Sequence, residues 1–484
     1  MEQSHLIELI RTLDKAEKEQ ILQFVDLPFF NQGKMRAYVV PLLDICLNHS
    51  WHPPQQRLEK KEVFASLFPS QTFIEGKLEK IMVEAHKVVR TVLVVCNYLR
   101  EENEFHQIFD FSEIARTRGL DARYQQLLAK LQKMQEGDPW KNAPYFYRQF
   151  LLEKAKHDEE TIHNHVKGDL NIPNVIHALS LHYYLNHLAM LNFLLLQQKA
   201  AKVEVPESLK SQLGESLLPE LYLEESPALR ANHTIFNLLK KDRPEPNDIR
   251  SLFDFLKLHE KNFDKVNLQE FYSYLRSLCI LVLSADIERV EIEDTLHELY
   301  KDNLERGYLH YEGKLHPSRY WAVSSNAVRV NDFDWAIEFI EKYKHEIIGE
   351  NESRDIYRLN LANYLFGKGR FSESLDNIPA TSPYVDYLLA GKRLEIKAYY
   401  ELKSDLLSFR LEAFKVFLSR TSPKLLSEAH KQNHVDFANL LTQISVSIPG
   451  DHKRAERVIK RLQEKKQSAE WRWLLEKAKA LKEG

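Results

Sequence analysis

The chain has 484 residues, and its 67 Lys and Arg nearly balance its 70 Asp and Glu, which leaves a formal charge of −3. Only 14 residues are glycine, about 3% where ~7% is usual. Few positions therefore suit the left-handed backbone of tight hairpins and phosphate-binding loops. This composition argues against β-sandwiches and doubly wound nucleotide-binding folds, and we expect an all-α protein.

Helix signals recur along the chain, whereas alternating strand patterns are nearly absent. Asp14 with Glu17 three residues later is typical of a capping box before an apolar helix face. Apolar residues at three- and four-residue steps predict a long helix over 74–100. Pro173 at a first turn predicts another over 174–199.

Turn-forming residues divide this helical pattern into three predicted parts. Gly137, Asp138 and Pro139 form the first clear break in the helical pattern. After residue 265, pairs of predicted helices alternate with short turns. We predict an N-terminal helical domain over 1–137, a central helical region over 138–265 and a C-terminal array of helical hairpins over 266–484.

The cysteines and the apolar stretches indicate a compartment. Cys46, Cys96 and Cys279 are far apart within apolar helical patterns and form no Cys-x-x-Cys pair, which is typical of reduced core thiols. The first residues are too charged for a secretory segment. Apolar stretches such as 188–196 are shorter than the ~20 residues that cross a bilayer, so we expect them to form buried helix faces. A cytoplasmic protein without a membrane partner is expected.

Two segments of the C-terminal third, 323–340 and 361–378, superimpose with an offset of 38 residues. Each reads as an amphipathic helix, a three-residue turn and a second helix. Asn331 and Gly369 occupy the turn position at which a left-handed backbone is needed. Each turn is followed by an aromatic residue and then by a small residue where the paired helices approach, namely Phe333 and Ala336 in the first copy and Phe371 and Ser374 in the second.

This pattern resembles the tetratricopeptide repeat, whose signature combines that turn, aromatic residue and small residue. A weaker third copy over 394–420 has Ser404 at the start of its turn and Phe409 at the position of the small residue. The resemblance implies a right-handed α-solenoid with a concave surface. The remainder of the chain resembles long, uncharacterised bacterial helical-repeat proteins in its general helical pattern, without diagnostic residues.

The resemblance also implies which residues face a partner, because the first helix of each tetratricopeptide pair lines the groove. The residues placed there are Trp321, Ser325 and Arg329 of the first copy and Asn360 and Asn363 of the second. Asparagine side chains there would hydrogen-bond an extended peptide, and Arg329 would pair with a carboxylate. The alternative is that these are solvated polar positions and that Trp321 belongs to the core.

One cluster of histidines suggests a metal. Glu160 and His163, close to His157 and His165, have the Glu-x-x-His spacing of di-iron helical bundles. That chemistry needs a second such pair and converging ligands, and the neighbours are polar, so we expect a solvated helix end and no bound metal or other cofactor.

The C-terminal segment 451–484 is basic, with 11 Lys and Arg against 6 Asp and Glu. Together with Trp471 and Trp473 it could contact phosphate backbones. The alternative is a pair of capping helices whose charged residues form the polar outer face that ends a repeat stack.

These patterns favour a cytoplasmic protein–protein interaction scaffold that binds a protein segment or helix in a concave helical groove. A nucleic-acid-associated protein that uses the basic C-terminal helices and a metal-dependent helical-bundle enzyme are the alternatives. The chain contains no phosphate loop, no Gly-x-Ser-x-Gly elbow and no His-Glu-x-x-His helix. We therefore predict no catalytic residue and an unidentified protein, not a nucleic acid, as the partner.

Overall fold

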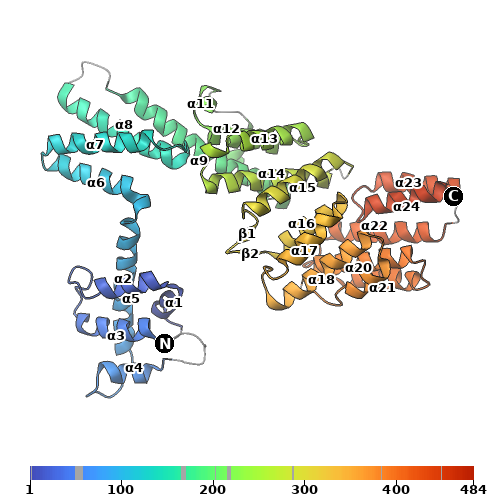
Figure 1. Cartoon of the computed structure of the whole chain (residues 1–484), viewed down its shortest axis with the longest axis horizontal. Coiled ribbons are helices and arrows are strands. Elements are labelled where there is room, and N and C mark those ends of the chain that lie inside the picture. The colour runs from blue at the N-terminus through green and yellow to red at the C-terminus, as the bar shows by residue number, and fades with distance from the viewer. Residues whose placement is uncertain are drawn as a thin grey trace. The chain divides into compact units, whose positions relative to one another are not determined.

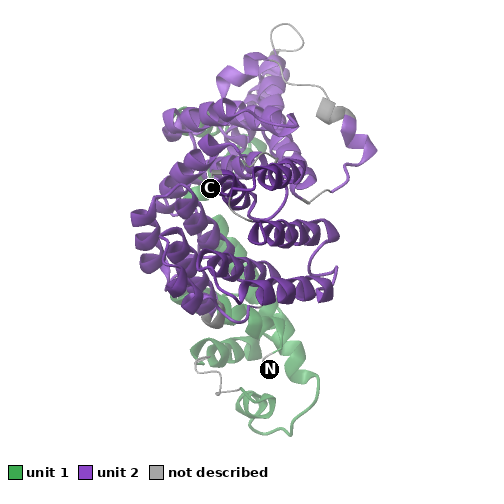
Figure 2. Ribbon diagram, turned by 90° about the vertical axis from the view of Figure 1, so that its right-hand side faces the viewer, with its two compact units in different colours: residues 1–137 green, residues 138–484 purple. Residues whose placement is uncertain are grey.

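A computed structural model describes residues 1, 3–49, 58–164, 170–201, 203–214, 220–285, 288–382, 384–447 and 450–483. Over these residues the protein is 76% helical, with 24 α-helices and one short two-stranded hairpin, so the prediction of an all-α protein is confirmed (Figure 1). The chain divides into two compact units, Met1–Gly137 and Asp138–Gly484 (Figure 2). The further division near residue 265 stays a prediction.

The first unit contains the helices α1 (His5–Thr12), α2 (Lys15–Phe24), α3 (Arg36–Asn48), α4 (Lys60–Leu67), α5 (Lys77–Tyr98), α6 (Glu104–Thr117) and α7 (Asp121–Glu136), with a 3₁₀ turn at Glu101–Asn103. Asp14 caps α2 as predicted, since its Oδ1 accepts from the Glu17 amide at 2.8 Å and Glu17 bonds back to the Asp14 amide. The predicted long helix is α5, whose buried face carries Ile81 and Val89 and packs on α1, α2 and α3.

The second unit begins with α8 (Ala143–Asn164), α9 (Ile172–Ala201), α10 (Glu207–Gly214), α11 (Glu220–Glu225), α12 (Pro227–Lys240), α13 (Pro246–Leu258), a 3₁₀ turn at Glu260–Asn262, α14 (Lys265–Ala285) and α15 (Val290–Glu305). It continues with β1 (His310–Tyr311), β2 (Lys314–Leu315), α16 (Pro317–Arg329), α17 (Phe333–Tyr343), α18 (Glu350–Gly367), α19 (Phe371–Asn377), α20 (Val385–Glu401), α21 (Leu407–Arg420), α22 (Glu428–Ser445), α23 (His452–Glu464) and α24 (Trp471–Glu483).

Neighbouring helices of the second unit pack in the order of the sequence. In its C-terminal half some helices also pack on the helix after next: α16 packs on α18, α18 on α20, and α22 on α24. One apolar core runs from Phe146 to Ala390, and a second runs from Leu389 to Leu481. Packing is therefore continuous on both sides of residue 265.

The two repeat turns adopt the backbone that the sequence predicts. Asn331 and Gly369 both have positive φ, 61° and 75°. Ala336 and Ser374 are fully buried, and Ser374 Oγ donates to the carbonyl of Ala362 on α18 at 2.8 Å. Small side chains at these positions let the second helix of each pair approach the first.

The weaker third copy differs from the other two. Lys403 adopts the left-handed backbone with φ 52°, but α21 begins only at Leu407. Phe409, aligned with the small residues of the other copies, is 67% exposed and does not lie at the helix contact. The longer turn shifts the packed face of α21 to Leu411 and Phe414.

The helix predicted over 174–199 is present as α9, but not all of its apolar stretch is buried. Leu188 and Leu195 are in the core, whereas Met190 and Phe193 on the opposite face are 65% and 52% exposed. The helix is apolar on both faces, so the expectation that 188–196 forms only a buried face is wrong for these two residues.

Candidate functional site

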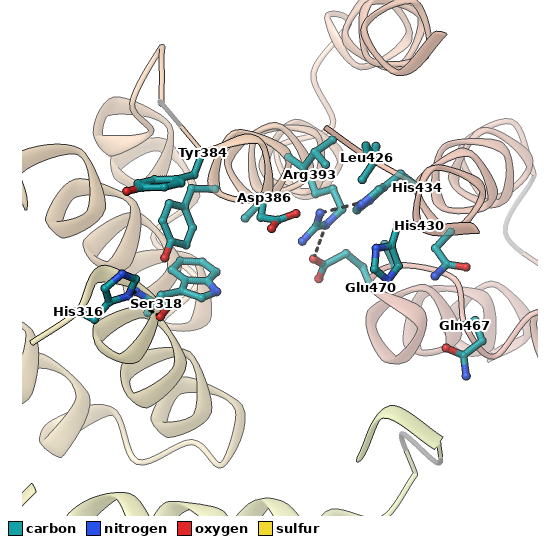
Figure 3. Close-up of a pocket in the computed structure, with 16 residues that line it drawn as sticks. His316, Ser318, Tyr384, Asp386, Arg393, Leu426, His430, His434, Gln467 and Glu470 are labelled. Atoms are coloured by element: carbon teal, nitrogen blue, oxygen red, sulfur yellow. Dashed lines mark hydrogen bonds and ion pairs between the residues drawn. The ribbon is translucent and has the colours of Figure 1, made fainter. Parts of the chain in front are cut away.

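A cavity of about 670 Å³ lies in the C-terminal half of the second unit. Three helices and one turn contribute its walls: α16 with its N-cap His316, α20 with the preceding Tyr384, α22, and the turn 467–470 that leads into α24 (Figure 3). The lining residues come from a span of more than 150 positions, so only the tertiary fold brings them together. The volume falls within the ~300–1,000 Å³ of typical ligand pockets.

One wall of the cavity is aromatic. Trp321 of α16 and Tyr387 of α20 have ring centroids 6.4 Å apart, and Tyr384 stands edge-on to Tyr387 at 5.6 Å. Burial raises the pKa of Tyr387 to about 12, with the nearby Tyr384 and Asp386 adding to the effect, so this ring stays neutral. Tyr384 is 44% exposed. These rings offer a large, rigid contact surface.

The opposite wall is a hydrogen-bonded ion cluster centred on Glu470. Arg393 Nε lies 3.0 Å from Glu470 Oε1, and Lys397 Nζ lies 2.7 Å from Oε2. Burial alone would raise the pKa of Glu470, but Lys397 and Arg393 outweigh it and lower that pKa to about 2. Glu470 has φ 57°, an unfavourable backbone for a residue other than glycine, so the ion pairs hold it in a strained position.

His434 of α22 completes this wall. Arg393 Nη1 lies 3.3 Å from His434 Nδ1, which accepts the hydrogen bond because the guanidinium only donates. Burial, aided by the charge of Arg393, lowers the pKa of His434 to about 4. The imidazole is therefore neutral at pH 7, and the guanidinium is engaged on two sides by residues of the protein itself.

Asp386 lies between the two walls, in the first turn of α20 (Figure 3). Its side chain is exposed, and it forms no hydrogen bond or ion pair with any residue that the structure describes. An acid in a first helical turn is favourable to the helix dipole, which accounts for its presence but leaves the carboxylate open to the cavity.

Of the five residues predicted to face a groove, Trp321 alone lines this cavity. Asn360 lies in the core instead, because α16 and α18 pack closely there: Ser324 Oγ donates to Asn360 Oδ1, and Asn360 Nδ2 donates to the Ile356 carbonyl at 2.6 Å. Ser325 Oγ is also buried, without a hydrogen-bond partner among the described residues.

The other two predicted residues lie at the surface of the second unit. Arg329 is about half exposed, and its Nε lies 3.5 Å from Oε1 of the buried Glu293 on α15. Asn363 is half-buried on α18. Neither lines the cavity. Tyr384, Tyr387 and the Glu470 cluster were not predicted from the sequence as parts of a site. The one local signal is that the two tyrosines stand three residues apart at the start of a helix; the Glu470 cluster has no such signal.

The histidine cluster does not assemble into a metal site in the part of the chain that is described. His157 Nδ1 lies 2.6 Å from the Leu170 carbonyl, while His165 and the side chain of His163 lie outside the described residues. Among the described side chains, no group of three or more His, Cys, Asp and Glu is placed to hold a metal ion.

Five of the eleven basic residues of the segment 451–484 form ion pairs within the chain, and all five lie in α24 or in the turn before it. Ion pairs join Lys465 to Asp436 at 2.5 Å, Lys466 to Glu288 at 2.6 Å, Lys477 to Glu401 at 2.7 Å, Lys482 to Glu456 at 3.0 Å, and Arg472 to Glu293. Trp471 is buried, with its Nε1 donating to the Leu462 carbonyl at 2.7 Å, and Trp473 donates to Glu401 at 2.9 Å. Both indoles are thus used in packing.

No family model matches the chain, and comparisons with curated proteins and with solved structures find no match either. Among the described helices, none combines the length and the apolarity needed to cross a membrane.

Proposed function

We propose that the protein is an interaction scaffold that docks a segment of a partner protein in the cavity between α16, α20, α22 and the turn 467–470. The observation that carries this proposal is the pairing of an aromatic wall, Trp321, Tyr384 and Tyr387, with a polar wall around Arg393. Aromatic and arginine side chains supply most of the binding energy in protein interfaces. The cavity is built from rigid helices, which lowers the entropy cost of binding.

The arrangement of hairpins supports a tetratricopeptide-like, right-handed solenoid as the architecture behind this function. Asn331 and Gly369 share the left-handed turn, and Ala336 and Ser374 share the close helix contact. In such an array the first helices of successive pairs line the concave face. Those helices would be α16, α18, α20 and α22, of which all but α18 line the cavity. A cytoplasmic location belongs to the same proposal.

Selection from a displayed library of random peptides tests the docking function. The wild-type chain should enrich a set of peptides that the variant Tyr384→Ala, alone or with Trp321→Leu, binds weakly. Leucine keeps the apolar contacts of Trp321 with the core. Tyr311→Ala is the matched control, because Tyr311 is 67% exposed in the same unit and lies outside the cavity. The proposal fails if the cavity variants and the control enrich the same peptides with equal affinity.

Two alternatives from the sequence receive less support. Lys465, Lys466 and Arg472 could contact nucleic acid only by leaving their carboxylate partners, which leaves the exposed basic residues of α23 as the phosphate contacts of this alternative. Retention of the protein on heparin that falls steeply with salt would favour this alternative. A metal-dependent enzyme would be favoured by zinc or iron that copurifies with the protein.

A further inference from the structure

We infer that the anchor residue of the docked segment is basic, an arginine or a lysine whose charged group meets Asp386 and whose stem lies on the faces of Trp321 and Tyr387. This inference rests on the proposed docking function and names the chemistry of the partner at that same cavity.

The charges that line the cavity point to a cation. Asp386 and Glu470 are its acids and Arg393 is its guanidinium. Glu470 is already paired with two cations, with Arg393 Nε 3.0 Å from its Oε1 and Lys397 Nζ 2.7 Å from its Oε2. Lys397 reaches it from the side of Phe366, over whose ring its Nζ lies 4.6 Å from the centroid. Asp386 is the lining carboxylate that has no cation among the described residues, so it is the charge that a ligand would neutralise.

The neighbours of Asp386 fit a basic side chain. Tyr387 follows it directly in the sequence, and Trp321 and Tyr384 flank Tyr387 with ring centroids at 6.4 and 5.6 Å. Aromatic faces attract ammonium and guanidinium groups and also cover their aliphatic stems. Figure 3 shows Asp386 between Tyr384 and Arg393, so a group on the aromatic wall would have the carboxylate at its side.

An acidic anchor fits the cavity less well. Arg393 would be its receptor, but this guanidinium is bound by Glu470 through Nε and by His434 through Nη1 at 3.3 Å. His434 stays neutral beside it. An incoming carboxylate or phosphate would also approach two fixed acids, Asp386 and Glu470. The positive wall is thus satisfied internally, whereas the negative charge of Asp386 is not.

The same displayed library of random peptides tests the inference by the composition of the enriched peptides. We expect wild-type protein to enrich Arg or Lys at one position. The variant Asp386→Asn, which keeps the size of the side chain, should bind those peptides about tenfold more weakly, the loss of one charge-assisted contact. Asp386→Lys should reverse the preference toward Asp and Glu. Asp405→Asn is the matched control, an exposed aspartate between α20 and α21 that does not line the cavity.

The outcomes separate this inference from the docking function. Peptides that lack a basic preference, or carry acidic residues, but lose binding in Tyr384→Ala would overturn the basic anchor and leave docking intact. Failure of the wild type to enrich any peptide over the Tyr384→Ala Trp321→Leu variant would overturn both. Since Asp386 and Asp405 are exposed, far-ultraviolet circular dichroism should match the wild type in all three aspartate variants, which excludes misfolding as the cause. The melting temperature should be unchanged in Asp405→Asn and slightly lower in the Asp386 variants, most in Asp386→Lys, which puts a cation at the start of α20.

Discussion

Lys397 of α20 and Glu470, the residue directly before α24, form an ion pair with Nζ and Oε2 separated by 2.7 Å. Their side chains are 10% and 24% exposed, and Arg393 bonds the other carboxylate oxygen. The cluster joins α20 to the turn that closes one side of the cavity, and it holds Glu470 in a left-handed backbone with φ 57°. The geometry of the polar wall therefore depends on this one carboxylate.

Replacement of the carboxylate should destabilise the second unit. Glu470→Gln leaves the sheltered ammonium of Lys397 without a counter-charge, and loss of one partner of a buried pair costs about 2–4 kcal/mol of unfolding free energy, after discount for partial exposure. Five of the six tryptophans follow residue 137, so urea unfolding followed by tryptophan fluorescence reports mainly on this unit.

Glu373→Gln is the control for that measurement. Glu373 pairs with Arg370, and both side chains are more than half exposed, so its loss should leave the midpoint unchanged. An equal loss of stability in the two variants would show that the Glu470 cluster is no more sheltered than a surface pair.

The pKa of Glu470, lowered to about 2, predicts a dependence of stability on pH. The carboxyl of the unfolded chain has a pKa of about 4.3. Below this pH the unfolded state binds a proton at Glu470, whereas the folded state stays ionised there until the pH approaches 2. The stabilisation is complete above pH ~4.5 and is lost as the pH falls toward 2. The difference in unfolding free energy between wild type and Glu470→Gln should shrink over that interval.

His434 predicts a second pH range, separate from that of Glu470, over which stability changes. Its folded pKa of about 4 lies below the ~6.5 of a free histidine. Between these values the unfolded state binds one more proton than the folded state, so acidification from pH 6.5 to 4 destabilises the protein. His434→Gln, which keeps an acceptor for Arg393, should lose stability less steeply than wild type over this range in urea unfolding series.

The control for the histidine is His452→Gln, which removes an exposed histidine of α23. Its profile should run parallel to that of the wild type. If His434→Gln also runs parallel, then the imidazole is not held neutral and the polar wall is positive at acidic pH.

Glu293 of α15 forms ion pairs of unequal strength with two arginines. Its side chain is 5% exposed, and it pairs directly with Arg472 of α24 but only at 3.5 Å with Arg329. Arg472→Ala leaves a buried anion and should cost about 2–3 kcal/mol, whereas Arg329→Ala should cost less than about 1 kcal/mol. Hydrogen exchange of α24 should rise in the first variant alone. Equal effects would mean that Arg329, the residue predicted to meet a partner, supports Glu293 as much as Arg472 does.

Local signals predicted local structure well. The capping box at Asp14, the proline at the start of α9 and the left-handed turns at Asn331 and Gly369 each depend on residues within a few positions of one another. Side-chain orientation beyond the helix was less predictable. Asn360 was expected at a groove, but it lies at the α16–α18 contact, where Ser324 satisfies it.

The cavity itself was outside the reach of the sequence. Asp386, His434 and Glu470 come from three elements separated by tens of residues, and no periodic pattern connects them. Burial along α9 was likewise not predictable from the sequence. This helix is apolar on both faces, so the spacing of its apolar residues does not show that the face with Met190 and Phe193 is exposed.

The equivalence of the two repeat turns gives the last prediction. A Cβ at Gly369, with φ 75°, meets no atom within 4 Å, so Gly369→Ala costs only the left-handed backbone, about 1–2 kcal/mol. Asparagine tolerates this conformation better and stands at the same position in the first copy as Asn331, so Gly369→Asn should cost less than Gly369→Ala.

Gly367, two residues earlier, should behave differently. Its Cβ would lie 2.8 Å from Phe333 Cε1 and 2.9 Å from Val328 Cγ1, side chains of the preceding pair. Gly367→Ala should therefore destabilise by about 1–3 kcal/mol through overpacking, and Phe333→Leu should relieve part of that loss. Thermal unfolding of the single and double variants measures the coupling. Additive losses would contradict the packing of one hairpin against the next, because only residues in contact share an interaction energy.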